Sequence, residues 1–104
     1  MYARVFRIQV DTRRIDEGIE IYEDGYVPEA EQQKGFKGAI LLGDRETGKG
    51  LAISMWESEA DARATEQSGF VQQVLGRFTE IFTEPPTMEG YEIMVKADVM
   101  ARTA

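Results

Sequence analysis

The stretch LAISMWESEADARATEQSG, Leu51 to Gly69, is the part of the sequence that decides the fold. Its first seven residues favour a strand, and Ser58 then begins S-E-A-D, which is close to a helix capping box. A strand therefore passes directly into a helix, and Trp56, the only tryptophan, stands at the junction. A large aromatic side chain at such a junction either packs the strand end against the helix or forms one wall of a ligand pocket.

Two more strands are predicted before this stretch. Residues 2–11, YARVFRIQVD, alternate between a more apolar and a more polar face, which is typical of a half-buried strand. GFKGAILLGD, residues 35–44, contains an apolar run and predicts a strand covered on both sides. The segment DRETGKG, residues 44–50, joins it to the third strand and predicts a hairpin turn.

Helical periodicity predicts one helix after the first strand and another after the third. Asp11 or Thr12 can cap the first, whose apolar stripe is formed by Ile15, Ile19, Tyr22 and Tyr26. Because Pro28 cannot donate a backbone hydrogen bond, we expect a kink or break near Gly25–Pro28 and an end at Gly35. The second helical region, 58–82, is interrupted at Ser68–Gly69. A fourth strand is predicted over 91–98 from the alternation of Tyr91, Ile93, Val95 and Ala97 with polar residues and Met94.

The element order is therefore β-α-β-β-α-β, and residues 1–104 are predicted to form a single domain. This is the ferredoxin-like pattern of the α+β class, an antiparallel four-stranded sheet with both helices on one face. Strands two and three carry apolar side chains at both parities: Ala39, Leu41, Leu51, Ile53 and Met55 at one, and Phe36, Ile40, Leu42, Ala52 and Trp56 at the other. Because both sheet faces need cover, we expect a homodimer packed sheet face to sheet face.

Composition excludes several classes of function. The chain carries 19 acidic and 12 basic residues, a net charge of −7, which argues against a nucleic-acid backbone as partner. It contains no cysteine, histidine or asparagine, so Ser–His and Cys–His catalytic pairs and a haem iron held by histidine cannot exist. No apolar run is long enough to cross a membrane and no signal-peptide core is present, which predicts a cytoplasmic location.

Three motifs resemble the antibiotic biosynthesis monooxygenase-like family of the dimeric α+β barrel superfamily. They are G-F-x-G at 35–38, the hairpin D-R-E-T-G-K at 44–49 and W-E-S-E-A-D at 56–61. The resemblance implies the fold, the dimer and a cavity between helices and sheet. It also implies a choice of activities, because the superfamily includes cofactor-independent monooxygenases of aromatic polyketides, quinol oxygenases and haem-degrading enzymes.

The haem-degrading branch uses an asparagine on the first strand and a tryptophan and a histidine in the second helical region. The comparable places here hold Phe6, Thr65 and Leu75. Because the chain has no histidine or cysteine and no clustered carboxylate spacing, we predict no bound haem, no essential metal and no other cofactor. Two functions stay open: a cofactor-independent monooxygenase of a polyketide- or quinol-like aromatic, and a non-catalytic ligand-binding or assembly domain.

The sequence assigns no catalytic residue, but six residues are candidates for lining a ligand pocket. They are Trp56, Tyr22, Tyr26, Arg7, Phe6 and Met55. Trp56 could stack on a flat ligand, a tyrosine hydroxyl could bind a phenol or quinone, and Met55 could supply adaptable apolar contacts. Arg7 either pairs with Glu92 or Asp98 of a neighbouring strand or stabilises a substrate enolate or phenolate.

Overall fold

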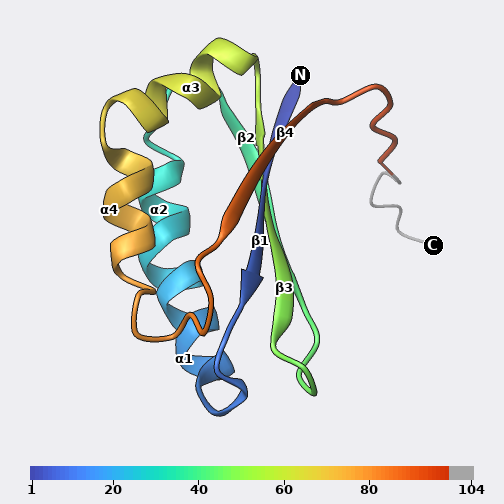
Figure 1. Cartoon of the computed structure of the whole chain (residues 1–104). Helices are drawn as coiled ribbons and strands as arrows, with labels where there is room; N and C mark the ends of the chain where they lie inside the picture. The colour runs from blue at the N-terminus through green and yellow to red at the C-terminus, as the bar shows by residue number, and fades with distance from the viewer. Residues whose placement is uncertain (99–104) are drawn as a thin grey trace, which may run out of the picture.

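All helices lie on one face of a four-stranded antiparallel sheet in the computed structural model, which describes residues 1–98 (Figure 1). The strands are β1 (Tyr2–Gln9), β2 (Phe36–Gly43), β3 (Lys49–Trp56) and β4 (Thr87–Glu92). Their order across the sheet is β2-β3-β1-β4. The predicted ferredoxin-like α+β architecture is confirmed, and no helix within residues 1–98 covers the other face of the sheet (Figure 1).

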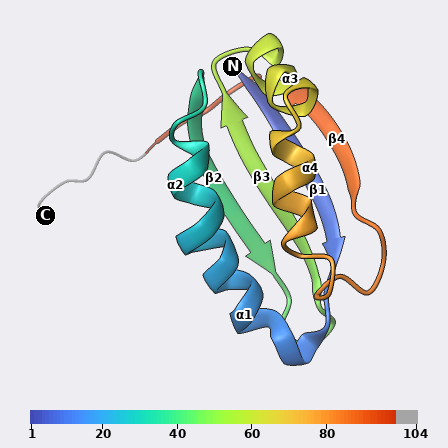
Figure 2. The same ribbon diagram turned by 90° about the vertical axis from the view of Figure 1, so that its left-hand side faces the viewer.

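The helices form two runs that extend alongside the strands on one face of the sheet (Figure 2). The first run contains a 3₁₀ turn (Thr12–Arg14), α1 (Ile15–Glu20), a π-helix (Ile21–Tyr26) and α2 (Val27–Ala30). The second contains α3 (Glu59–Gln67) and α4 (Phe70–Gly76). Within the described residues, no helix is both long and apolar enough to span a bilayer.

Both predicted helix caps are present. The Asp11 carboxylate accepts a hydrogen bond from the Arg13 amide at 2.9 Å, and the Ser58 hydroxyl accepts one from the Asp61 amide at 3.1 Å. These bonds satisfy amide donors that the first turn of a helix leaves free. The Ser58 cap fixes the point at which β3 gives way to α3, as the sequence predicts.

The first helical run is not broken at Gly25–Pro28, where the sequence predicts a kink or break. Its backbone instead widens into the π-helix, in which the Val27 amide donates to the Tyr22 carbonyl, five residues back. Pro28 has no amide hydrogen to give to the carbonyl of Asp24, and the wider turn accommodates this loss while the chain stays helical. Tyr22 and Tyr26 both belong to this turn, so it places two phenols beside each other.

The strand register assigns each side chain to one face of the sheet. Leu41 pairs with Ala52 and Ile40 pairs with Ile53, and a bulge between Phe36 and Gly38 shifts the start of β2. The helix-facing apolar set is Phe36, Ala39, Leu41, Ala52 and Trp56, and the outer set is Ile40, Leu42, Leu51, Ile53 and Met55. Both sets contain odd-numbered and even-numbered residues, because the register pairs odd-numbered residues of β2 with even-numbered residues of β3 and the reverse, as in Leu41–Ala52 and Ile40–Ile53.

The fourth strand begins four residues earlier and ends six residues earlier than the sequence predicts. It begins at Thr87 and ends at Glu92, which pairs with Tyr2 at the start of β1. The Ile93 amide still donates to the Met1 carbonyl at 2.9 Å, but residues 94–98 form no strand within the described chain. The alternation over 91–98 is therefore real in the sequence, but most of it lies outside the sheet.

The core lies between the sheet and the two helical runs. Trp56 and Ile81 are its largest fully buried side chains, and Tyr26, Ala30, Phe70 and Val74 form a compact cluster under the helices. The outer face is different, because Ile40 and Leu42 keep 46% and 48% of their surface exposed. An apolar sheet face is thus open to solvent in the isolated chain.

Candidate functional site

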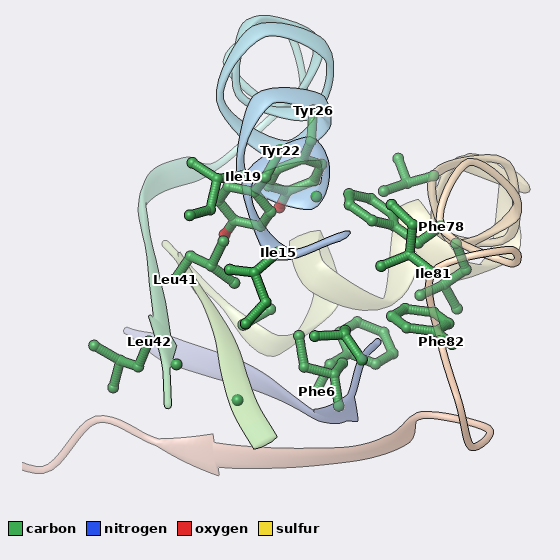
Figure 3. Close-up of a pocket in the computed structure, with 18 of the residues that line it drawn as sticks. Phe6, Ile15, Ile19, Tyr22, Tyr26, Leu41, Leu42, Phe78, Ile81 and Phe82 are labelled. Atoms are coloured by element: carbon green, nitrogen blue, oxygen red, sulfur yellow. The ribbon is translucent and has the colours of Figure 1, made fainter. Parts of the chain in front are cut away.

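An apolar cavity of about 200 Å³ lies between the helix-facing side of the sheet and the two helical runs (Figure 3). Phe6 projects into it from β1, and Ile15 and Tyr22 project from the first helical run. Phe78 and Phe82, which follow α4, close the opposite side (Figure 3). The cavity runs along β1 from Arg4 to Val10, a distance of about 20 Å at the usual rise of a strand.

Small residues create this space. Gly18 in α1 and Gly50 and Ala52 in β3 line the cavity and present little or no side chain to it. At Gly50 a β-carbon would come within 2.7 Å of the Leu42 carbonyl oxygen, closer than real contacts allow, so glycine is required there. A β-carbon on Gly18 would meet only Ile81, at an ordinary 3.8 Å. The cavity thus includes one position that a larger side chain could occupy without a clash at its β-carbon.

A buried guanidinium lies at the end of the cavity next to α3, which we call the inner end. Arg4, on the helix-facing side of β1, is only 3% exposed. Its Nη1 donates to the Ala62 carbonyl and the Thr65 hydroxyl, both at 2.8 Å, and to a Glu66 carboxylate oxygen at 3.2 Å. All three acceptors belong to α3, so this helix fixes the guanidinium in place.

Trp56 stands behind this guanidinium and does not line the cavity. Its side chain is fully buried, with the ring centroid 5.2 Å from Cζ of Arg4 and an edge-on contact with Phe36 at 5.4 Å. Its indole N–H donates to the Ser54 hydroxyl at 2.9 Å. The tryptophan at the strand end is therefore a packing residue that also supports a buried cation through its ring face.

The two tyrosines of the π-helix supply neutral hydroxyl groups. Their ring centroids are 4.9 Å apart, and both side chains line the cavity. Burial raises the pKa of the Tyr22 hydroxyl well above its usual range. Burial also raises the pKa of Tyr26, although the nearby Arg4 cation and hydrogen bonding to Ser54 and Arg4 oppose the rise. Both phenols therefore stay protonated at neutral pH and act as hydrogen-bond donors rather than bases.

The other end of the cavity carries charged residues of the β2–β3 turn. Asp44, Arg45 and Lys49 all line it there, and Arg45 makes an ion pair of 3.0 Å with Asp16 of α1. The pKa of Asp44 is lowered chiefly because its carboxylate accepts the Glu46 amide at 2.8 Å. Asp44 is the one carboxylate in the lining within the described residues, and it stays ionised and engaged in the turn. Among the described lining residues, no carboxylate is therefore placed to act as a general base near neutral pH.

The structure brings three of the six predicted pocket residues together. Those three are Phe6, Tyr22 and Tyr26. The other three do not line the cavity: Trp56, Arg7 and Met55. Arg7 and Met55 lie on the outer face of the sheet, since Arg7 pairs in register with the outward Leu51.

Arg7 does form an ion pair across two strands, but with a different partner from those predicted. Its guanidinium donates to Glu89 of β4, which also accepts from the Tyr91 hydroxyl. The predicted partners are too far along the chain, because the observed register pairs Glu92 with Tyr2 and ends β4 there. An exposed pair of this kind contributes little stability.

Sequence reasoning overlooked Arg4 as a site residue. The available signal is a charged residue on the apolar parity of a strand, between Tyr2 and Phe6. A charge at such a position must be paired or functional, because burying an unpaired charge is costly. No group of three or more potential metal-ligating side chains exists within residues 1–98, so the structure offers no candidate metal centre there.

No protein-family model matches this sequence. An uncharacterized protein of Mycobacterium tuberculosis, Rv2557, is 33% identical over 93 residues, which cover 89% of this chain and 41% of the relative. A second uncharacterized protein of the same organism, Rv2558, is 29% identical over 93 residues, or 39% of its length. The chain thus spans about two-fifths of the length of these curated relatives.

Solved structures match the whole architecture. A protein described as an antibiotic biosynthesis monooxygenase superposes with a TM-score of 0.71 at 14% identity, over 91% of this chain and 100% of the other. The chain has the fold of the antibiotic biosynthesis monooxygenase-like proteins. The heme-degrader MhuD of Mycobacterium tuberculosis, solved with two hemes in its active site, has the same fold, with a TM-score of 0.75 at 17% identity over 94% of this chain and 100% of MhuD. The antibiotic biosynthesis monooxygenase-like fold therefore accommodates more than one chemistry.

Proposed function

We propose that this protein binds a flat, largely apolar small molecule in the cavity between its helices and its sheet. The observation that carries the proposal is the cavity itself, which is apolar along its length and has hydroxyl and guanidinium donors at its inner end. Ligand sites are usually apolar hollows with a few convergent polar groups, and this one is small even for such a site. It suits a molecule of one to three rings with an oxygen acceptor at one end.

We also infer that the functional unit is a homodimer in which a second copy covers the outer sheet face. The exposed Ile40 and Leu42 and the adjoining Ile53 support this, since monomeric proteins rarely leave a sheet face of this kind in water. The dimer would leave the cavity intact, because the cavity opens on the helix-facing side of the sheet.

Filling the cavity at Gly18 tests the proposed function. Gly18→Leu extends a side chain from a helical position into the space, and it removes the roughly 1 kcal/mol by which glycine disfavours a helix interior. We expect the variant to be at least as stable as the wild type and to bind naphthoate and naphthamide at least tenfold more weakly. Isothermal titration calorimetry measures the affinities, and thermal unfolding checks the fold.

Gly76→Leu is the matched control for that experiment. It makes the same change in α4, at a glycine whose β-carbon would meet nothing within 4 Å and which does not line the cavity. Its ligand affinity should equal that of the wild type. Equal loss of binding in both variants, or unchanged binding in both, would place the ligand elsewhere and refute the cavity as the binding site.

A second candidate function is cofactor-independent oxygenation of the bound aromatic. The observation that favours it is a cationic Arg4 beside the protonated phenol of Tyr26 in an apolar space, with the phenol of Tyr22 packed on Tyr26, since such donors stabilise a substrate phenolate or enolate. The ring CH₂ of the substrate would lose a proton to water, because Asp44, the one carboxylate of the described lining, is engaged in the β2–β3 turn. The resulting anion would form a carbon–oxygen bond with dioxygen and take up a proton to give a hydroperoxide. Loss of water would then turn a ring CH₂ into a carbonyl, with one oxygen atom in the product and the other in water.

Oxygen uptake with an anthrone as substrate distinguishes catalysis from binding. If the protein is an oxygenase, the wild type should consume one dioxygen per anthrone oxidised, and isotope-labelled dioxygen should place one labelled atom in the quinone. Gly18→Leu should reduce the rate to that of the uncatalysed reaction. A wild-type rate equal to the uncatalysed one, together with measurable binding, would leave the protein as a binding module.

A further inference from the structure

Arg4 uses only part of its hydrogen-bonding capacity. Within the described residues, its three hydrogen bonds all come from Nη1, and all run to α3. The Nε–H group is buried and has no partner among those residues. Nε and Nη2 form the edge of a guanidinium that binds a carboxylate through two parallel hydrogen bonds. In residues 1–98, no carboxylate occupies the edge of Arg4 used for bidentate recognition, although the Tyr26 hydroxyl lies near the guanidinium.

The charge of Arg4 is also only partly balanced. Glu66 is the one carboxylate that pairs with it in the described chain, through Nη1 at 3.2 Å, and the Glu66 side chain is 29% exposed. The rings of Trp56 and Phe6, with centroids 5.2 and 5.9 Å from Cζ, surround the guanidinium with apolar surface. A buried N–H without an acceptor is costly, and an anionic acceptor would remove that cost.

Two further donors lie at the same end of the cavity. The Ser54 hydroxyl accepts the indole N–H of Trp56, faces the Tyr26 hydroxyl with its own hydrogen, and lines the cavity. Tyr26 lines the cavity beside it. The inner end thus gathers a guanidinium and two hydroxyl groups, while the one carboxylate of the described lining, Asp44, belongs to the β2–β3 turn at the other end. The group missing from this arrangement is an acceptor.

We propose that Arg4 is the anchor for an anionic oxygen of the ligand, a carboxylate or an ionised phenol, with Ser54 and Tyr26 as neighbouring donors and the apolar body lying along β1. This inference rests on the proposed function and narrows it to apolar anions. Trp56 and α3 act as positioning elements that hold the guanidinium at the end of the cavity.

The test compares naphthoate with naphthamide, which share a ring system and differ in charge. Calorimetry on the wild type should show naphthoate binding at least tenfold more tightly. Arg4→Met, which keeps an apolar stem but removes the charge, should weaken naphthoate roughly 10- to 100-fold and change naphthamide less than about threefold. Arg4→Lys should fall between, because it keeps the charge but loses the bidentate edge.

A variant of the partner carboxylate keeps the inference testable if Arg4→Met does not fold. Glu66→Gln removes the anion that competes for Arg4, so naphthoate should bind about three- to tenfold more tightly and naphthamide should be unaffected. Glu59→Gln is the matched control. It removes the same charge from the same helix at an exposed residue that pairs with Arg63, and it should change the naphthoate affinity less than about twofold.

The outcomes separate the anchor from the proposed function. Equal affinities for naphthoate and naphthamide, unchanged by Glu66→Gln, would overturn the anchor and leave the cavity as a neutral-ligand site. No binding of either compound to the wild type would overturn both. Decanoate provides the last comparison: tighter binding of decanoate than of naphthoate, with the same dependence on Arg4 and Glu66, would support the anchor and assign the body of the ligand to an alkyl chain.

Discussion

Ile53→Asp should convert a dimer of the 11.7 kDa chain into a folded monomer. Ile53 lies on the outer face of β3, between Val5 of β1 and Ile40 of β2 in the strand register. A carboxylate there would be harmless to an isolated sheet face in water but would be buried unpaired in a sheet-to-sheet interface, at a cost of several kcal/mol. Sedimentation velocity at micromolar concentration measures the change in mass, and circular dichroism confirms the fold.

Leu41→Asp is the contrasting substitution, one strand away and on the other face. Leu41 faces the helices and lines the cavity, so its charge should lower the free energy of unfolding rather than dissociate a folded dimer. The predicted interface should bury more than roughly 1,200 Å² in total, the range of stable complexes. A wild-type protein that sediments as a single 11.7 kDa species would contradict the dimer.

Trp56→Ala should lower the free energy of unfolding by roughly 3–5 kcal/mol, the usual cost of removing a buried aromatic side chain. Trp56 has no exposed surface, contacts Phe36 edge-on and donates to Ser54. Since domains of this size are stable by only about 5–15 kcal/mol, the loss should be evident in urea denaturation followed by circular dichroism.

Trp56→Phe is the conservative control, because it keeps much of the packing area and loses only the indole N–H bond. It should cost less than half as much as Trp56→Ala. A loss below about 1 kcal/mol for Trp56→Ala would show that the strand end does not depend on this side chain, and the packing role assigned to it would be wrong.

The sequence predicts the order of elements well because each rests on a local signal. Ser58 and Asp11 are caps that act within three residues, and the β2–β3 turn is defined by its own glycines. The position of β4 does not follow from a local signal. Which residues of 87–98 join the sheet is decided by where β1 begins, at Tyr2, and that pairing is a long-range property.

The site is less predictable than the fold for a related reason. Phe6, Tyr22 and Tyr26 follow from periodicity, because apolar stripes face the interior where a cavity forms. Arg7 and Arg4 differ by three positions on one strand and so lie on opposite faces, and only the observed register shows which of them reaches the cavity. The π-helix also has no signature in the sequence beyond Pro28 itself.

Intermolecular nuclear Overhauser effects between naphthoate and the wild-type protein test the central claim most directly. We expect contacts from the naphthalene protons to the rings of Phe6, Tyr22 and Phe78, which surround the cavity (Figure 3). The single indole N–H resonance should also shift, since Trp56 lies behind Arg4. Contacts confined to Ile40 and Ile53 on the outer sheet face, or no contact at saturating naphthoate, would contradict a ligand site between the helices and the sheet.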